Sequence, residues 1–130
     1  MLKQFFVLYS VTLLVMAVMD VIWLKGVMQQ LFKTQVGELM EFRLAPAVIF
    51  YLLYPIGIVL FVSLGAKDWQ SALMYGCALG LLCYGTYDLT NLATLRPWTV
   101  QFAVIDIAWG GVVTGVSAVA GWSITRSLLG

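Results

Sequence analysis

Three aspartates stand inside apolar stretches of the sequence, where a carboxyl group is able to hold a proton or a ligand. Asp20 lies in "VMDVIWL", Asp88 in "YDLTNL" and Asp106 in "VIDIAWG". An aspartate within a membrane span costs on the order of 3 kcal/mol when it faces lipid. We therefore expect all three side chains to point inward, toward one another or toward a wet cavity.

Each aspartate has an aromatic or amide residue three or four positions away, a spacing that puts both on one helix face. These pairs are Asp20 with Trp23, Asp88 with Tyr84 and Asn91, and Asp106 with Trp109. Arg43 and Arg96 stand next to the apolar segments, on the side where the aspartates are expected. The aspartates, their partners and these two arginines are the candidate binding residues.

Three carboxylates that converge in a medium of low dielectric constant cannot all stay ionised without a cation. Some of them carry a proton, or Arg43, Arg96 or Lys25 reaches in as a counter-ion, or a hard cation binds. Oxygen ligands suit Mg²⁺ or Ca²⁺, but no spacing here is typical of a metal site, and we expect no metal and no cofactor. The structural alternative is that the aspartates only tie helices together through hydrogen bonds.

The elements that position these residues follow from the composition. The chain of 130 residues is 62% hydrophobic and 10% charged, with a mean hydropathy of +0.98. A soluble domain has about a quarter of its residues charged, so the composition predicts an integral membrane protein. A net charge of +1 gives no case for nucleic acid. Histidine is absent, which removes the commonest general base.

Four apolar segments approach or exceed the ~20 residues that a spanning helix needs. They are continuous rather than alternating, which favours helices over strands. We predict an all-α fold, an antiparallel bundle of four transmembrane helices in one domain (residues 1–130). The predicted spans are Phe5–Leu24, Leu44–Leu64, Ser71–Leu95 and Thr99 to about Thr125.

The connections differ in length. The segment Lys25–Arg43 alternates apolar and polar residues at helical spacing, which predicts an amphipathic helix on the membrane surface or an extension of the first span. The other two connections are short, so neighbouring helices are expected to be antiparallel. This threading puts the three aspartates at one end of the bundle, roughly 6–10 Å below one interface. Three cationic residues are expected on one side of the membrane and four on the other. Under the positive-inside rule this difference is too small to set the orientation, so dual topology is also open.

Other features of the spans carry weaker expectations. Pro55 should kink the second span and free a carbonyl that a neighbour or water must satisfy. The pairs Gly76–Gly80 and Gly111–Gly115 allow close helix approach, unless glycine is simply common in such helices. Among the tyrosines, Tyr51 and Tyr75 are expected to be ordinary packing or interfacial residues. Tyr54, Tyr84 and Tyr87 could line a cavity.

At "MDVIWL", "YDLTNLATLRPW" and "DIAWG" the chain resembles a family of small bacterial predicted membrane proteins, described as a domain of unknown function. The resemblance implies four helices in a bacterial inner (cytoplasmic) membrane, crossed several times. Members of that family are often encoded beside fatty-acid-modifying enzymes of the cyclopropane-synthase type, which implies a lipid context. No activity comes with the resemblance.

Our leading hypothesis is that the acidic pocket binds a lipid or fatty acyl group, with Arg43 and Arg96 facing phosphate or carboxylate. A proton-coupled transporter similar to the small multidrug resistance family is an alternative, with Asp20 as the proton carrier. A membrane enzyme that uses Asp88 and Asp106 as acid and base is another, and so is a structural subunit of a larger complex. The expected partners are membrane lipids. The sequence also allows a homo-oligomer or partner chains of a membrane complex.

Overall fold

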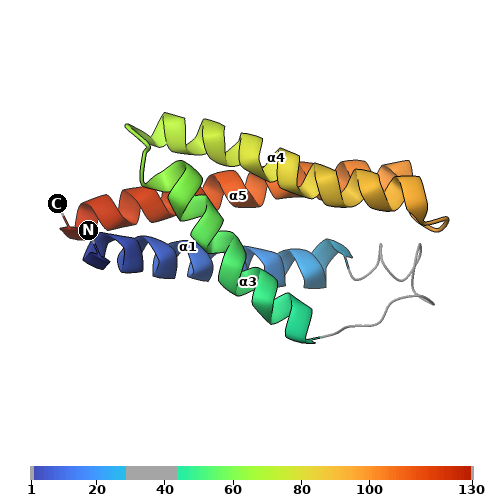
Figure 1. Ribbon diagram of the computed structural model, residues 1–130, viewed down its shortest axis with the longest axis horizontal. Coiled ribbons are helices and arrows are strands. Elements are labelled where there is room, and N and C mark those ends of the chain that lie inside the picture. Colours follow the sequence, from blue (N-terminus) through green and yellow to red (C-terminus); the bar gives the residue numbers. More distant parts are fainter. Residues whose placement is uncertain (1, 29–43, 130) are drawn as a thin grey trace.

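The computed structural model describes residues 2–28 and 44–129, which are almost entirely helical (Figure 1). Two π-helical turns, Leu24–Met28 and Val59–Ser63, continue the first two helices. Within the described ranges no strand occurs, and the predicted all-α fold is confirmed. The predicted amphipathic connection lies mostly outside these ranges. The helices are α1 (Leu2–Trp23), α3 (Leu44–Ile58), α4 (Trp69–Thr94) and α5 (Val100–Leu129).

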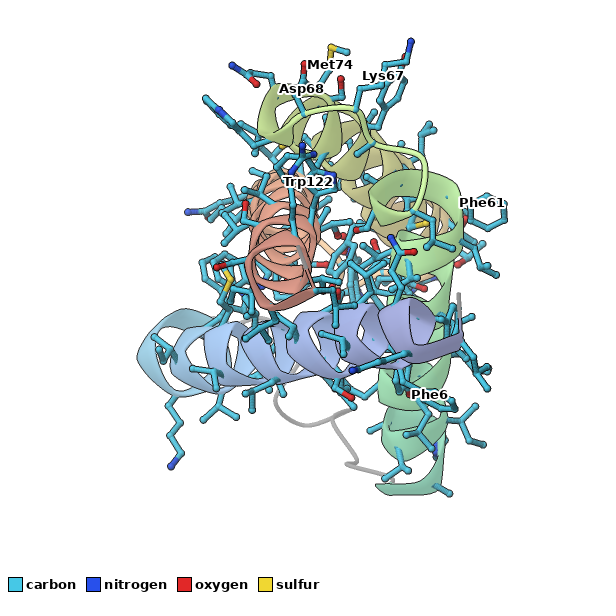
Figure 2. All side chains as sticks on the ribbon, turned by 90° about the vertical axis from the view of Figure 1, so that its left-hand side faces the viewer. Phe6, Phe61, Lys67, Asp68, Met74 and Trp122 are labelled. Carbon is cyan, nitrogen blue, oxygen red and sulfur yellow. The ribbon has the colours of Figure 1, made fainter. Side chains whose placement is uncertain are left out.

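Three stretches are long and apolar enough to cross a membrane: Leu2–Gly26, Ala45–Ser63 and Val100–Leu129. The fourth predicted span, α4, has the length, but its glycines, tyrosines and Asp88 make it less apolar. Large apolar side chains point away from the bundle, as lipid contact requires: Phe61 is 77% exposed and Leu82 is 70% exposed. Figure 2 shows Phe61 directed outward from the π-helical turn that follows α3.

The central element is α5. Of its most apolar stretch 56% is buried inside the bundle, against 22% for α1 and for α3. Seen from the end that carries both termini, α5 has α4 on one side and α1 on the other, with α3 beside them (Figure 2). The residues that α5 presents therefore meet all the other helices, which is why a site in this bundle must include it.

Glycine lets α4 and α5 approach closely along their length. A Cβ atom at Gly76 would lie 2.9 Å from the Gly115 Cα, and one at Gly80 would overlap the carbonyl oxygen of Gly110. The expected close approach at the small-residue pairs is thus confirmed. Gly110, which lies outside the predicted pairs, takes part as well.

The proline in α3 has a neighbour that supplies a hydrogen bond. Pro55 lies inside the helix, and a π-helical turn begins four residues after it. The Tyr9 hydroxyl of α1 donates to the carbonyl of Leu52, 2.8 Å away and three residues before the proline. The carbonyl that loses its amide partner to Pro55 is that of Tyr51, four residues earlier, so this bond lies in the same turn and the expected donor to the freed carbonyl stays a prediction.

The side chains of Asp68 and Thr99 cap the N-termini of the last two helices. Asp68 precedes α4, and its Oδ1 accepts from the backbone amide of Ser71 at 2.8 Å. This amide holds the pKa of the exposed Asp68 carboxyl below its usual range. Thr99 does the same for α5, accepting from the Phe102 amide at 3.1 Å. Both caps fix the residues at which the short connections end and the helices begin.

Candidate functional site

A cavity of about 480 Å³ lies between the four helices, near the end of the bundle where α1 finishes and α3 begins. Two carboxyl groups and seven aromatic rings face it, together with smaller apolar residues and one cysteine. Its volume falls within the range of ordinary small-molecule sites, about 300–1,000 Å³. The lining residues are Asp20, Trp23, Leu24, Pro46, Ala47, Phe50, Tyr51, Cys83, Tyr84, Tyr87, Phe102, Asp106 and Trp109.

Asp20 is held by two donors from other helices. The indole Nε1 of Trp109, on α5, donates to its Oδ1 at 2.9 Å. The hydroxyl of Tyr51, on α3, donates to its Oδ2 at 2.7 Å. Each carboxylate oxygen thus has one partner, and the side chain is fixed at the junction of α1, α3 and α5. The sequence pairing of Asp20 with Trp23 is replaced here by a contact between helices.

Trp23 and Trp109 stack on each other. Their ring centroids are 4.4 Å apart and the planes lie within 3° of parallel, a face-to-face arrangement that buries both apolar surfaces. The Trp23 indole N–H is buried and has no hydrogen-bond partner among the described residues. A buried donor left in this way costs free energy, so the cavity wall presents a hydrogen-bond donor as well as acceptors.

Asp106 on α5 and Asp88 on α4 lie next to each other. Asp88 is 0% exposed and does not line the cavity, whereas Asp106 keeps 8% exposure and does. Neither oxygen of Asp88 has a hydrogen bond within the described residues, and its neighbours are Asp106 and the Trp98 indole. Two adjacent carboxyls shielded from water carry at most one negative charge between them unless a cation joins them.

The remaining candidate residues lie at the edge of this arrangement or outside it. Tyr84 lines the cavity, and its ring packs against the backbone of Gly110. Asn91 is half-buried on α4, and Arg96 is exposed in the connection that follows; neither lines the cavity. Arg43 lies outside the described residues. The structure therefore brings Asp20, Trp23, Tyr84, Asp106 and Trp109 around one cavity, with Asp88 next to Asp106 but outside the lining.

Tyr51 was expected to be a packing or interfacial residue, and this expectation is wrong. Its hydroxyl donates to Asp20, and its ring lines the cavity. Tyr87 lines it as expected, and Phe50 and Phe102 line it without having been candidates. The signal available in the sequence was the Tyr51–Tyr54 pair in an apolar span, because a buried phenol usually finds a hydrogen-bond partner. Tyr54 bonds to Thr114 at 2.7 Å and is not part of the lining.

The chemistry of the cavity is acidic and aromatic. Among residues 2–28 and 44–129 no group of three or more side chains of the metal-ligating kinds is arranged to hold an ion. Carboxylate and ring faces together attract organic cations, through charge and through cation–π contact. A ligand with an ammonium group and a hydrogen-bond acceptor would satisfy both Asp106 and the Trp23 N–H.

Comparison with known proteins gives a family. Neither a curated protein nor a solved structure matches the chain. A family described as "Predicted membrane protein (DUF2177)", a domain of unknown function, matches residues 5–123. These residues include all of α3 and α4, most of α1 and α5, and every residue that lines the cavity. With nearly the whole chain covered, the protein belongs to this family of membrane proteins.

Proposed function

We propose that this protein binds a membrane lipid in the cavity beside Asp20 and Asp106, in a bacterial inner membrane as the sequence resemblance implies. The observation that carries the proposal is the lining itself: two carboxyl groups among aromatic rings, in a cavity of about 480 Å³ bounded by helices fit to cross a membrane. A site so placed is within reach of lipid headgroups.

The lining favours one class of lipid. Both oxygens of Asp20 already accept hydrogen bonds from Tyr51 and Trp109, whereas Asp106 lines the cavity beside the second carboxyl, Asp88. An ammonium headgroup would neutralise Asp106 and lie against the indole and phenol faces. A free fatty acid would bring a third carboxylate beside two others, which is unfavourable. The ligand we propose is therefore a lipid with an ammonium headgroup, such as a phosphatidylethanolamine.

The donor of Trp23 completes this assignment. Its indole N–H is buried in the cavity wall without a partner in the described chain. A phosphate or ester oxygen of the same lipid would accept from it. The acyl chains would then leave between the helices toward the surrounding lipid. Arg96, outside the cavity lining, remains a candidate for the phosphate, and so does Arg43, which the structure does not describe.

Native mass spectrometry of the full chain, released gently from its own membrane, tests the proposal. We expect bound phosphatidylethanolamine, with Asp106→Asn weakening its retention about five-fold or more, the effect of one charge near a lipid surface. Asp68→Asn, at the other end of the bundle, removes the same charge and should leave retention unchanged. A ligand-free protein, or equal retention in Asp106→Asn and the wild type, would refute the proposal.

A second function is favoured by one observation, the contact of the buried Asp88 with Asp106. A pair of carboxyls that shares a proton releases it when a cation arrives, which is the chemistry of a proton-coupled exporter of organic cations. Adding tetraphenylphosphonium to unbuffered protein should then acidify the solution, and Asp88→Asn should abolish the release. Binding without proton release would leave the lipid-binding function alone.

A further inference from the structure

A second cavity, of about 370 Å³, lies at the opposite end of the bundle. It is bounded by the start of α1, the end of α5 and the connection that leads into α4. Its lining includes Gln4, Thr125 and Arg126 as polar groups and Leu64 and Leu129 as apolar ones. Figure 2 looks onto this end of the molecule. Nothing in the proposed lipid site at Asp106 involves these residues.

Arg126 is positioned beside this cavity by an aromatic ring. Its guanidinium carbon lies 5.0 Å from the ring centroid of Trp122, within the range of a cation–π contact. The Trp122 Nε1 donates to the carbonyl of Ala66 at 3.0 Å, which ties α5 to the connection before α4. Among the described residues no carboxylate forms an ion pair with Arg126, so its five donors are available to a ligand.

Thr125 contributes a buried donor to the same cavity. Its side chain is 3% exposed, and its hydroxyl has no hydrogen-bond partner in the part of the chain that the structure describes. A hydroxyl in this position is left unsatisfied until a ligand or water arrives. The nearby acid, Asp68, is occupied with capping α4, and Figure 2 shows Lys67 and Asp68 on the outer side of the connection, above Trp122.

A guanidinium, a buried hydroxyl and an apolar edge together recognise an anionic phosphate group attached to a chain. Arginine matches two phosphate oxygens with parallel donors, and the leucines would contact the first carbons of a lipid. We propose that this second cavity binds the phosphate of an anionic phospholipid, with Arg126 and Thr125 as its ligands. The protein would thus contact an acidic headgroup at one interface and an ammonium headgroup at the other.

The test titrates phosphatidylglycerol into delipidated full-length protein in detergent and measures the bound fraction by native mass spectrometry. Arg126→Gln should weaken binding about five-fold or more, the loss expected for one cation at a lipid surface. Thr125→Val, which keeps the shape and removes the hydroxyl, should weaken it about two- to five-fold. Lys67→Gln is the matched control, because it removes a cation from the same end without touching the cavity lining, and it should bind as the wild type does.

The alternative outcomes separate the sources of phosphate. If excess inorganic phosphate displaces the lipid from the wild type, the cavity takes the free ion and the lipid assignment is overturned. An equal loss in Lys67→Gln and Arg126→Gln would mean diffuse surface attraction, and no loss in Thr125→Val would remove the buried hydroxyl from the site. Asp106→Asn should leave this binding intact, so failure of the first proposal is distinguishable from failure of this one. If Arg126→Gln does not fold, Thr125→Val carries the test.

Discussion

Replacing Gly80 by alanine adds one methyl group where α4 and α5 touch. This methyl would overlap the carbonyl oxygen of Gly110 and lie 2.7 Å from its carbonyl carbon and 2.8 Å from the Thr114 Cβ. Two of these atoms belong to the backbone of α5, so no side-chain rotation relieves the overlap. The helices must separate by roughly 1 Å before the carbon contacts return to their usual ~3.5–4.0 Å.

The cost follows from that separation. A gap of about 0.5–1 Å forfeits a quarter to a half of the dispersion energy between facing atoms, and overpacking of a close-packed contact costs about 1–3 kcal/mol. Alanine's higher helix propensity offsets little, because helices in a membrane or micelle stay formed when they part. We therefore expect Gly80→Ala to lower the free energy of unfolding by about 1–3 kcal/mol.

Gly85→Ala supplies the control on the same helix. A Cβ atom at Gly85 has nothing within 4 Å, so this substitution should change the stability by about 0.5 kcal/mol or less. The assay is unfolding of the full chain in detergent micelles by added dodecyl sulfate, followed by tryptophan fluorescence. Equal stability of the two variants would refute the reasoning, since it would mean that α4 and α5 are not in contact at Gly80.

Three further predictions concern other contacts. Tyr51→Phe should destabilise the protein by about 0.6–1.7 kcal/mol, the range for hydrogen bonds between membrane helices. The loss should shrink in an Asp20→Ala background, which removes the acceptor; additive losses would argue against the bond. Trp109→Phe should cost more than Tyr51→Phe in the same unfolding assay, because it removes both a donor to Asp20 and a stacked ring. The Asp68 carboxyl, whose pKa is lowered by the Ser71 amide, adds stability above its ordinary pKa that is lost as pH falls through the lowered value. Asp68→Asn should therefore be less stable than the wild type at neutral pH and approach it in acid, as measured by unfolding across pH; a constant difference would contradict this.

The helix positions could be predicted from the sequence because apolar runs of spanning length leave few other structures. Predicted Ser71–Leu95 corresponds to α4 at Trp69–Thr94, and predicted Leu44–Leu64 to α3 with its π-helical turn. Only the apolar character of α4 was overestimated. The spacing of residues within one segment is sufficient to predict where a helix begins and ends, because these boundaries depend on that segment alone.

The contacts between side chains of the site could not be predicted from spacing within one helix. Spacing paired Asp20 with Trp23, one turn away, whereas the structure pairs it with Trp109, 89 positions later in the chain. A rule for one helix face cannot say which helix lies opposite, and Tyr51 was misjudged for the same reason. The convergence of Asp20, Asp88 and Asp106 at one end was predictable, because antiparallel threading fixes depth even where it does not fix contacts.

The stacked pair of Trp23 and Trp109 makes the protein its own optical probe. Two indoles 4.4 Å apart and nearly parallel couple their electronic transitions, which splits the near-ultraviolet circular dichroism band and quenches their fluorescence. The coupling falls off steeply with distance, so a small rotation of α1 against α5 would weaken the split band and brighten the emission. A ligand that enters beside Asp106 and moves these helices could thus be followed in real time, without any label.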